Sequence, residues 1–154
     1  MQFLFYSISN EKILEFEHFP ELTLAACYAI TAVDSFQNES AFSVKACVDS
    51  CIYYRLPNVF SPNDDGINDL FIPYPFKFVE KIEMKIFNRW GKLVFKTDNP
   101  EILWKGNYLD GDKKVPDGVY YYICDVYERR LTGIEVRAVS GFLHLFGAKN
   151  RYKN

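Results

Sequence analysis

Alternation of apolar and polar side chains in the middle of the chain limits its fold more than any other feature. Ile82, Met84 and Ile86 are separated by charged residues within the segment 82–87, and this period of two is typical of a β-strand with one buried face. Segments of similar texture recur along the chain, separated by turn-forming residues. No segment combines a 3.6-residue periodicity with helix caps. The sequence therefore predicts an all-β protein.

Composition agrees with this prediction. The 154 residues include 14 Phe and 11 Tyr, and 49% of the chain is apolar, which is enough for a core and suits the half-buried surface of a sheet. The net charge of −2 gives no electrostatic basis for nucleic-acid binding, which requires a basic face. The sequence contains no apolar run of about 18 residues or more, so we expect no membrane span.

Two expected strands and the turn between them constrain how the cysteines can pair. The four cysteines are Cys27, Cys47, Cys51 and Cys124. Four cysteines allow three pairings, but a hairpin folded about residue 37 places Cys27 opposite Cys47, within disulfide reach. Cys51 and Cys124 would then form the second disulfide. Two disulfides would indicate an oxidising compartment; the alternative is four reduced, buried thiols.

Changes of texture divide the chain into two predicted units. Residues 1–50 contain four expected strands, at 2–7, 13–16, 25–33 and 42–48, which suit the last part of a β-sandwich. Residues 51–57 are the expected linker, since Pro57 cannot donate to a ladder. The N-terminus lacks the basic region and cleavage site of a signal peptide. We therefore expect a fragment from the C-terminal end of a larger exported protein.

The second unit, residues 58–146, has the turn spacing of a small antiparallel β-sandwich of immunoglobulin-like type. Asn88–Gly91 predicts a hairpin turn with Gly91 at positive φ, and Pro116–Gly118 predicts a second turn. Long strands are expected at 119–128 and 136–146, separated by the charged stretch 129–135. Residues 147–154 form a basic tail.

Several motifs in this unit resemble a known family. They are Asn58–Asn63 with Asp65–Asp69, Ile86–Gly91 with Leu93–Phe95, Trp104–Gly106, Pro116–Tyr122 and Gly141–Leu145. Together they resemble the gliding-motility-associated C-terminal domain, the type B sorting domain of the type IX secretion system in Bacteroidetes. Lys105 departs from the pattern, because the family usually has Asp there. Residues 27–34 resemble the end of a fibronectin type III-like domain.

The resemblance implies a non-catalytic sorting domain. The attached upstream protein would cross to the periplasm, and the type IX outer-membrane machinery would then recognise the domain and bring the protein to the cell surface or the medium. We expect the framework of the recognised surface to come from the motif residues and the last strand. The motif residues are Asn88, Arg89, Trp90, Gly91, Trp104, Gly106, Pro116, Gly118, Tyr120 and Tyr122.

An acidic turn is the candidate metal site. Its potential ligands are Asn63, Asp65, Asn68 and Asp69. Oxygen-bearing side chains before a sharp glycine turn suit Ca²⁺, but the position corresponding to the last EF-hand ligand is Ile72. The alternative is a network of side-chain hydrogen bonds that holds the turn without a metal. We expect no other cofactor.

The sequence indicates no enzyme. His18 and His144 have no Ser or Cys partner in a recognisable motif, so we expect no catalytic residues. Trp90 and Trp104 are expected to pack as core, and the alternative is a binding platform. That platform would make the chain an adhesin or a carbohydrate-binding module, dependent on Ca²⁺ if the acidic turn binds it. The run Tyr120–Tyr122 places rings on both sheet faces, so an exposed ring could form a docking patch.

Overall fold

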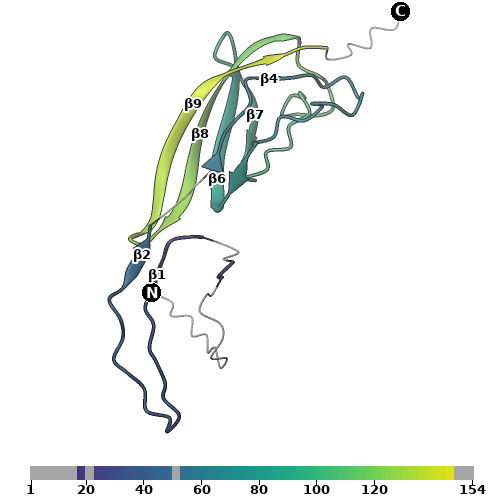
Figure 1. Cartoon of the computed structure of the whole chain (residues 1–154). Helices are drawn as coiled ribbons and strands as arrows, with labels where there is room; N and C mark the ends of the chain where they lie inside the picture. Colours follow the sequence, from purple (N-terminus) through teal and green to yellow (C-terminus); the bar gives the residue numbers. More distant parts are fainter. Residues whose placement is uncertain (1–16, 20–22, 50–52, 148–154) are drawn as a thin grey trace, which may run out of the picture.

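The computed structural model describes residues 17–19, 23–49 and 53–147, and within these residues the chain forms strands and no helix (Figure 1). This confirms the all-β prediction. The strands are β1 (Ala26–Tyr28), β2 (Ala46–Val48), β3 (Tyr53–Tyr54), β4 (Val59–Phe60), β5 (Phe76–Lys77), β6 (Val79–Asn88), β7 (Leu93–Thr97), β8 (Gly118–Arg130) and β9 (Gly133–Leu145).

The main sheet has five strands in the order β4-β9-β8-β6-β7. All neighbours are antiparallel except β4, which runs parallel to the end of β9. The β8–β9 hairpin is longer than predicted. The stretch 129–135, expected to be a connection, continues both strands and leaves only Leu131 and Thr132 as the turn.

Ion pairs explain why this charged stretch remains in the sheet. Glu128 is buried on the inner face and accepts hydrogen bonds from Arg137 Nε at 2.7 Å and from Arg130 Nη2 at 3.2 Å. A buried carboxylate is tolerated when it is paired in this way. The two arginines therefore allow the charged ends of β8 and β9 to remain paired.

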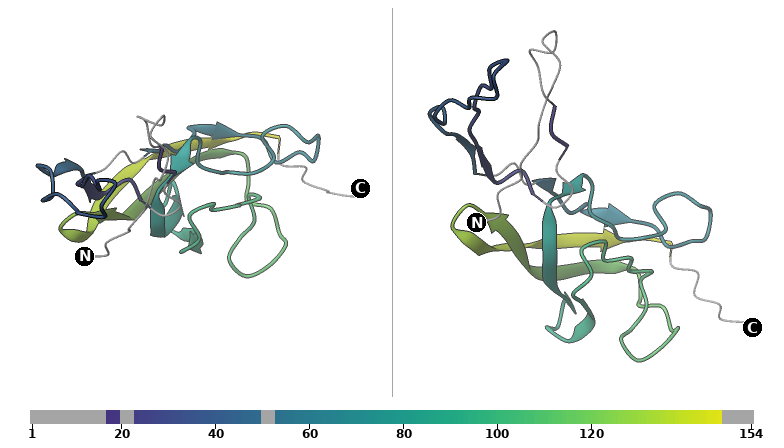
Figure 2. Two further views of the ribbon diagram at one scale, coloured as in Figure 1. Left: turned by 60° about the horizontal axis from the view of Figure 1, so that its bottom comes forward. Right: turned by 90° about the horizontal axis from the view of Figure 1, so that it is seen from below.

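The alternation at 82–87 sets the inner face of the sheet. Ile82, Met84 and Ile86 are fully buried. The second layer consists of the β3–β5 pair and of loops joined by the bridge between Phe71 and Trp104, and Figure 2 shows the loop after β7 curving away from the sheet before it returns to β8. The core residues are Tyr54, Phe60, Phe71, Ile82, Met84, Ile86, Val94, Ile102, Trp104, Val115, Tyr120, Tyr122, Cys124, Val126, Leu143 and Leu145. The chain is thus an all-β sandwich.

The first unit extends from the tip of the β8–β9 hairpin (Figure 1). Three contacts to the hairpin lie among the described residues: Thr23 Oγ1 donates to the Arg129 carbonyl at 3.1 Å, Asp49 Oδ1 accepts from the Leu131 N–H at 2.9 Å, and Asp49 Oδ2 lies 3.8 Å from the Arg130 guanidinium. Its described strands are the β1–β2 pair. The strands expected at 2–7 and 13–16 lie outside the described residues, so the likeness to a fibronectin type III domain stays a prediction.

The cysteine predictions are half correct. Cys27 lies opposite Cys47 in the β1–β2 register, and the two form a disulfide. Cys124, however, is a free thiol buried in the core, so the predicted Cys51–Cys124 disulfide is wrong; Cys51 lies outside the described residues. Strand alternation directs Cys124 to the inner face of β8, and burial raises the pKa of its thiol to about 12.

Cys124 should therefore be unreactive until the domain unfolds. We expect iodoacetamide to leave it unmodified in the native protein, because alkylation requires an accessible thiolate, and to modify it fully in denaturant. Peptide mapping by mass spectrometry measures both. Rapid alkylation of Cys124 in the folded protein, or its recovery in a disulfide, would contradict the structure.

Candidate functional site

The β6–β7 turn holds its backbone by a local network around one side chain. Asn88 Oδ1 accepts hydrogen bonds from the backbone N–H groups of Trp90 at 3.0 Å and Lys92 at 2.9 Å. Gly91 has φ of 77°, as predicted, and a residue with a Cβ would be strained there. The turn is therefore rigid without help from the core.

This rigid turn presents Trp90 to solvent. Its side chain is 75% exposed, which corrects the expectation that both tryptophans are core residues. The Arg89 guanidinium lies 4.3 Å from the centre of the Trp90 ring, a cation–π contact that restricts both side chains. A fixed, exposed Trp–Arg pair has the composition of an interface hot spot.

Trp104 is, as predicted, a core residue. It is 1% exposed, and its Nε1–H donates to the Asn107 carbonyl at 2.8 Å. Its ring lies 5.4 Å from Phe95 and 5.3 Å from Phe60, measured between ring centres. Because Trp104 is enclosed, the two tryptophans do not form a shared binding platform.

Gly106 allows this enclosure. It has φ of 75°, and a Cβ at this position would lie 3.0 Å from a Leu145 methyl and 3.1 Å from Pro62 Cγ. Lys105, where the family pattern has Asp, is exposed, and its carbonyl accepts a hydrogen bond from Lys114 Nζ. The Trp104–Gly106 motif is therefore structural.

The Pro116–Tyr122 motif divides between the core and the surface. Tyr120 and Tyr122 are buried, and the Tyr120 hydroxyl donates to the Pro116 carbonyl at 2.6 Å. Burial raises the pKa of Tyr120 to about 12. Gly118 begins β8. Tyr121 points to the opposite face and is half exposed, which confirms that the tyrosine run places rings on both faces.

An aromatic stripe on the outer face of the sheet was not predicted. Phe142, His144 and Phe146 follow one another on that face, with ring centres 5.6 and 5.7 Å apart. Phe142 lies directly opposite Tyr121 on β8. These four side chains are called the aromatic face below. The period-two pattern of Phe142–Phe146 was a signal for it, since Leu143 and Leu145 fill the core from the other side.

The acidic turn is held by its own side chains. Asp69 accepts hydrogen bonds from the N–H groups of Asp64 and Gly66, both at 2.7 Å, and Asp65 accepts one from Ile67. Desolvation raises the pKa of Asp69, but the backbone donors outweigh it and hold the pKa below its usual value. The Asn63 side chain donates a hydrogen bond to the Asp65 carboxylate and accepts one from the Asp65 N–H.

This arrangement matches the hydrogen-bond network expected as the alternative to a metal site. Asn68 contributes backbone geometry, with a positive φ and a carbonyl that accepts from Ser61 N. Among the residues that the structure describes, no group of three or more His, Cys, Asp or Glu side chains is placed to hold a metal. A calcium ion would have to displace backbone donors from Asp69.

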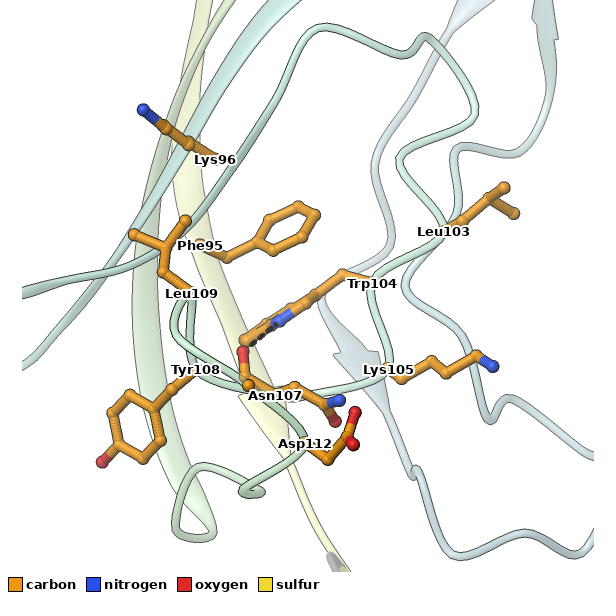
Figure 3. Close-up of a pocket in the computed structure, with 10 residues that line it drawn as sticks. Phe95, Lys96, Leu103, Trp104, Lys105, Asn107, Tyr108, Leu109 and Asp112 are labelled. Atoms are coloured by element: carbon orange, nitrogen blue, oxygen red, sulfur yellow. Dashed lines mark hydrogen bonds between the residues drawn. The ribbon is translucent and has the colours of Figure 1, made fainter.

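An open pocket lies beside Trp104 (Figure 3). Phe95, Trp104 and Tyr108 supply its aromatic side, and Asn107 and Asp112 supply polar groups. Asn107 Oδ1 is buried and has no hydrogen-bond partner. The residues that line this pocket include no His, Ser, Thr or Cys, so the pocket offers no thiol, no aliphatic hydroxyl and no imidazole base.

The fold and these surfaces define a β-sandwich domain whose exposed features suit binding to another protein. Comparison with protein families identifies it further: the family model of the CHU_C type IX secretion signal domain matches residues 54–145. The chain therefore belongs to this family, which is a secretion-signal family and not a catalytic one. No curated protein and no solved structure matches the chain significantly. The described residues form no helix able to span a bilayer.

The two tryptophans should differ sharply in their effect on stability. We expect Trp104→Ala to lower the free energy of unfolding by about 3–5 kcal/mol, because it removes a buried ring and leaves a cavity. Trp90→Ala should change it by about 0.5 kcal/mol or less, because the ring is exposed. Denaturant unfolding measures both, and equal losses would show that the two rings are not placed as described.

The acidic turn predicts a pH-dependent effect. The folded pKa of Asp69 lies below its unfolded value, so the carboxylate stabilises the fold above roughly pH 4 and loses this contribution as the pH falls through the folded pKa. We expect Asp69→Asn to lower Tm at neutral pH and to match the parent in acid. Asp110→Asn, in another exposed turn, is the control. A Tm that rises with Ca²⁺ and falls with EDTA would instead support the metal site.

Proposed function

We propose that this domain is the recognition element through which the type IX secretion machinery exports the protein joined to it. The protein is delivered to the cell surface or the medium, and the domain makes or breaks no bond. The observation that carries this proposal is the family match over residues 54–145. The Cys27–Cys47 disulfide supports a route through an oxidising compartment.

The outer side of the sandwich supports recognition by surface contact. The Trp90 turn directly follows β6, and Phe87 at the end of this strand is the cross-strand neighbour of Tyr121, which in turn lies opposite Phe142. The turn and the aromatic face are thus connected across adjacent strands. An exposed set of this composition, which includes half-exposed Phe and Tyr rings, is typical of a protein-binding surface.

The machinery would recognise the folded domain. Trp104, Tyr120 and Tyr122 lie in the core, so these motif residues act by holding the turns and strands in place. Asn88, Arg89 and Trp90 are the motif residues that form the exposed turn. This division separates motif residues that support the fold from those that are available to a partner.

Export of a reporter tests the proposal. A Sec-targeted fluorescent reporter fused to the N-terminal side of residues 1–154 should leave a type IX-competent cell, and it should stay in the periplasm of a strain without the translocon. Quantitative immunoblotting of medium, surface and periplasm measures the distribution. Retention of the parent fusion in the competent strain would refute the proposed function.

Single substitutions test the surface. Truncation of a hot-spot tryptophan costs about 2 kcal/mol, a roughly 30-fold loss in affinity, so we expect Trp90→Ala to reduce export while thermal unfolding stays at the parent value. Tyr74→Ala is the matched control, because Tyr74 is 84% exposed and belongs to neither β8 nor β9 but to the loop before β5. Equal export of both variants and the parent would rule out Trp90 as a contact.

A further inference from the structure

One long edge of the main sheet is open. On one side, β9 pairs with β8 along its whole length, from Gly133 to Leu145. On the other side, its only neighbour among the described strands is β4, which pairs at His144 and Leu145. Eleven residues of β9, 133–143, therefore have no strand beside them in the described part of the chain.

The register identifies the backbone groups that face this open edge. His144 N donates to the Asn58 carbonyl and Phe146 N to the Phe60 carbonyl. The backbone N–H and C=O groups of even-numbered residues at the end of β9 therefore point away from β8. The β8–β9 register has no shift between Gly133 and Leu145, and alternate residues of a strand face opposite neighbours. The N–H and C=O groups of Ile134, Val136, Ala138, Ser140 and Phe142 therefore face the open edge.

Side chains along this edge do not block an added strand. Residues 133–143 contain no Pro and no Lys and no bulge, which are three of the devices that protect an exposed edge. Ile134 and Val136 are each 55% exposed. Among the described residues, the first unit contacts the hairpin at Arg129, Arg130 and Leu131, and none of these residues belongs to β9.

The charges favour a second copy of the same strand. The charged residues of this stretch are Glu135 and Arg137, one on each side of Val136, and both side chains are about half exposed. If two β9 strands pair antiparallel with Val136 opposite Val136 of the second copy, Glu135 lies opposite Arg137 of that copy, and the reverse pair forms by symmetry. Opposite charges in direct cross-strand positions stabilise such a pair.

We propose that two copies of this chain associate through the open edges of β9, antiparallel and centred on Val136, to form one continuous sheet. Ile134 lies opposite Ala138 of the second copy, and about six backbone hydrogen bonds form, because each of three facing pairs exchanges two. A single strand pair buries less than the roughly 1,200–2,000 Å² of a stable interface, so the dimer is weak and reversible. This association is independent of the sorting role.

Analytical ultracentrifugation of the full chain, from micromolar to millimolar concentration, tests the dimer. The sedimentation coefficient should rise towards that of a dimer. Val136→Lys, which places two lysines opposite each other, should raise the dissociation constant roughly tenfold or more. Ile123→Lys is the matched control, since Ile123 is 52% exposed on the same face but lies on β8, a strand paired on both sides; it should leave association unchanged.

A second variant and a second readout distinguish this geometry from other contacts. Glu135→Lys should also weaken the dimer, because it places like charges opposite Arg137 of the second copy, and hydrogen exchange at Val136 and Ala138 should slow as concentration rises. A monomer at every concentration would overturn the proposal. Association that Ile123→Lys weakens as much as Val136→Lys does would place the contact on the sheet face and overturn it as well.

Discussion

The burial of Trp104 is the interaction on which the rest of the domain depends. One face of the five-stranded sheet is covered mainly by loops, which have few backbone ladders of their own to hold them in place. Trp104 joins those loops to the sheet through ring contacts with Phe60 on β4, Phe95 on β7 and Tyr120 on β8. Without this cluster, the second layer would keep fewer contacts to the sheet, such as that of Phe71 with Tyr122 on β8.

Coverage of one face leaves the other free for recognition. Strand alternation directs Tyr122 and Leu143 into the core and their neighbours Tyr121 and Phe142 to solvent. The same period of two that builds the core therefore also builds the aromatic face. At the end of this sheet, Asn88 holds a turn that keeps Trp90 outside. A rigid surface of this kind can be recognised without a cavity or a reactive group.

Local patterns predicted what depends on local physics. The alternation at Ile82–Ile86 predicted the buried face of β6, and the hairpin about residue 37 predicted the Cys27–Cys47 disulfide. Tertiary contacts decided the rest. Trp90 and Trp104 both stand close before a glycine, and only the fold shows that one is exposed and the other enclosed. Pairing of Glu128 with Arg137 keeps a charged stretch in the sheet, which no local pattern could show.

Site-specific photo-crosslinking at Phe142, in a type IX-competent cell, tests most directly whether the aromatic face of the folded domain is what the machinery contacts. A photoreactive residue at this position should capture an outer-membrane component of the type IX machinery, identified by mass spectrometry, and the same residue at position 74 should not. Export of the fusion with no such crosslink from Phe142, or with an equal crosslink from position 74, would contradict the account.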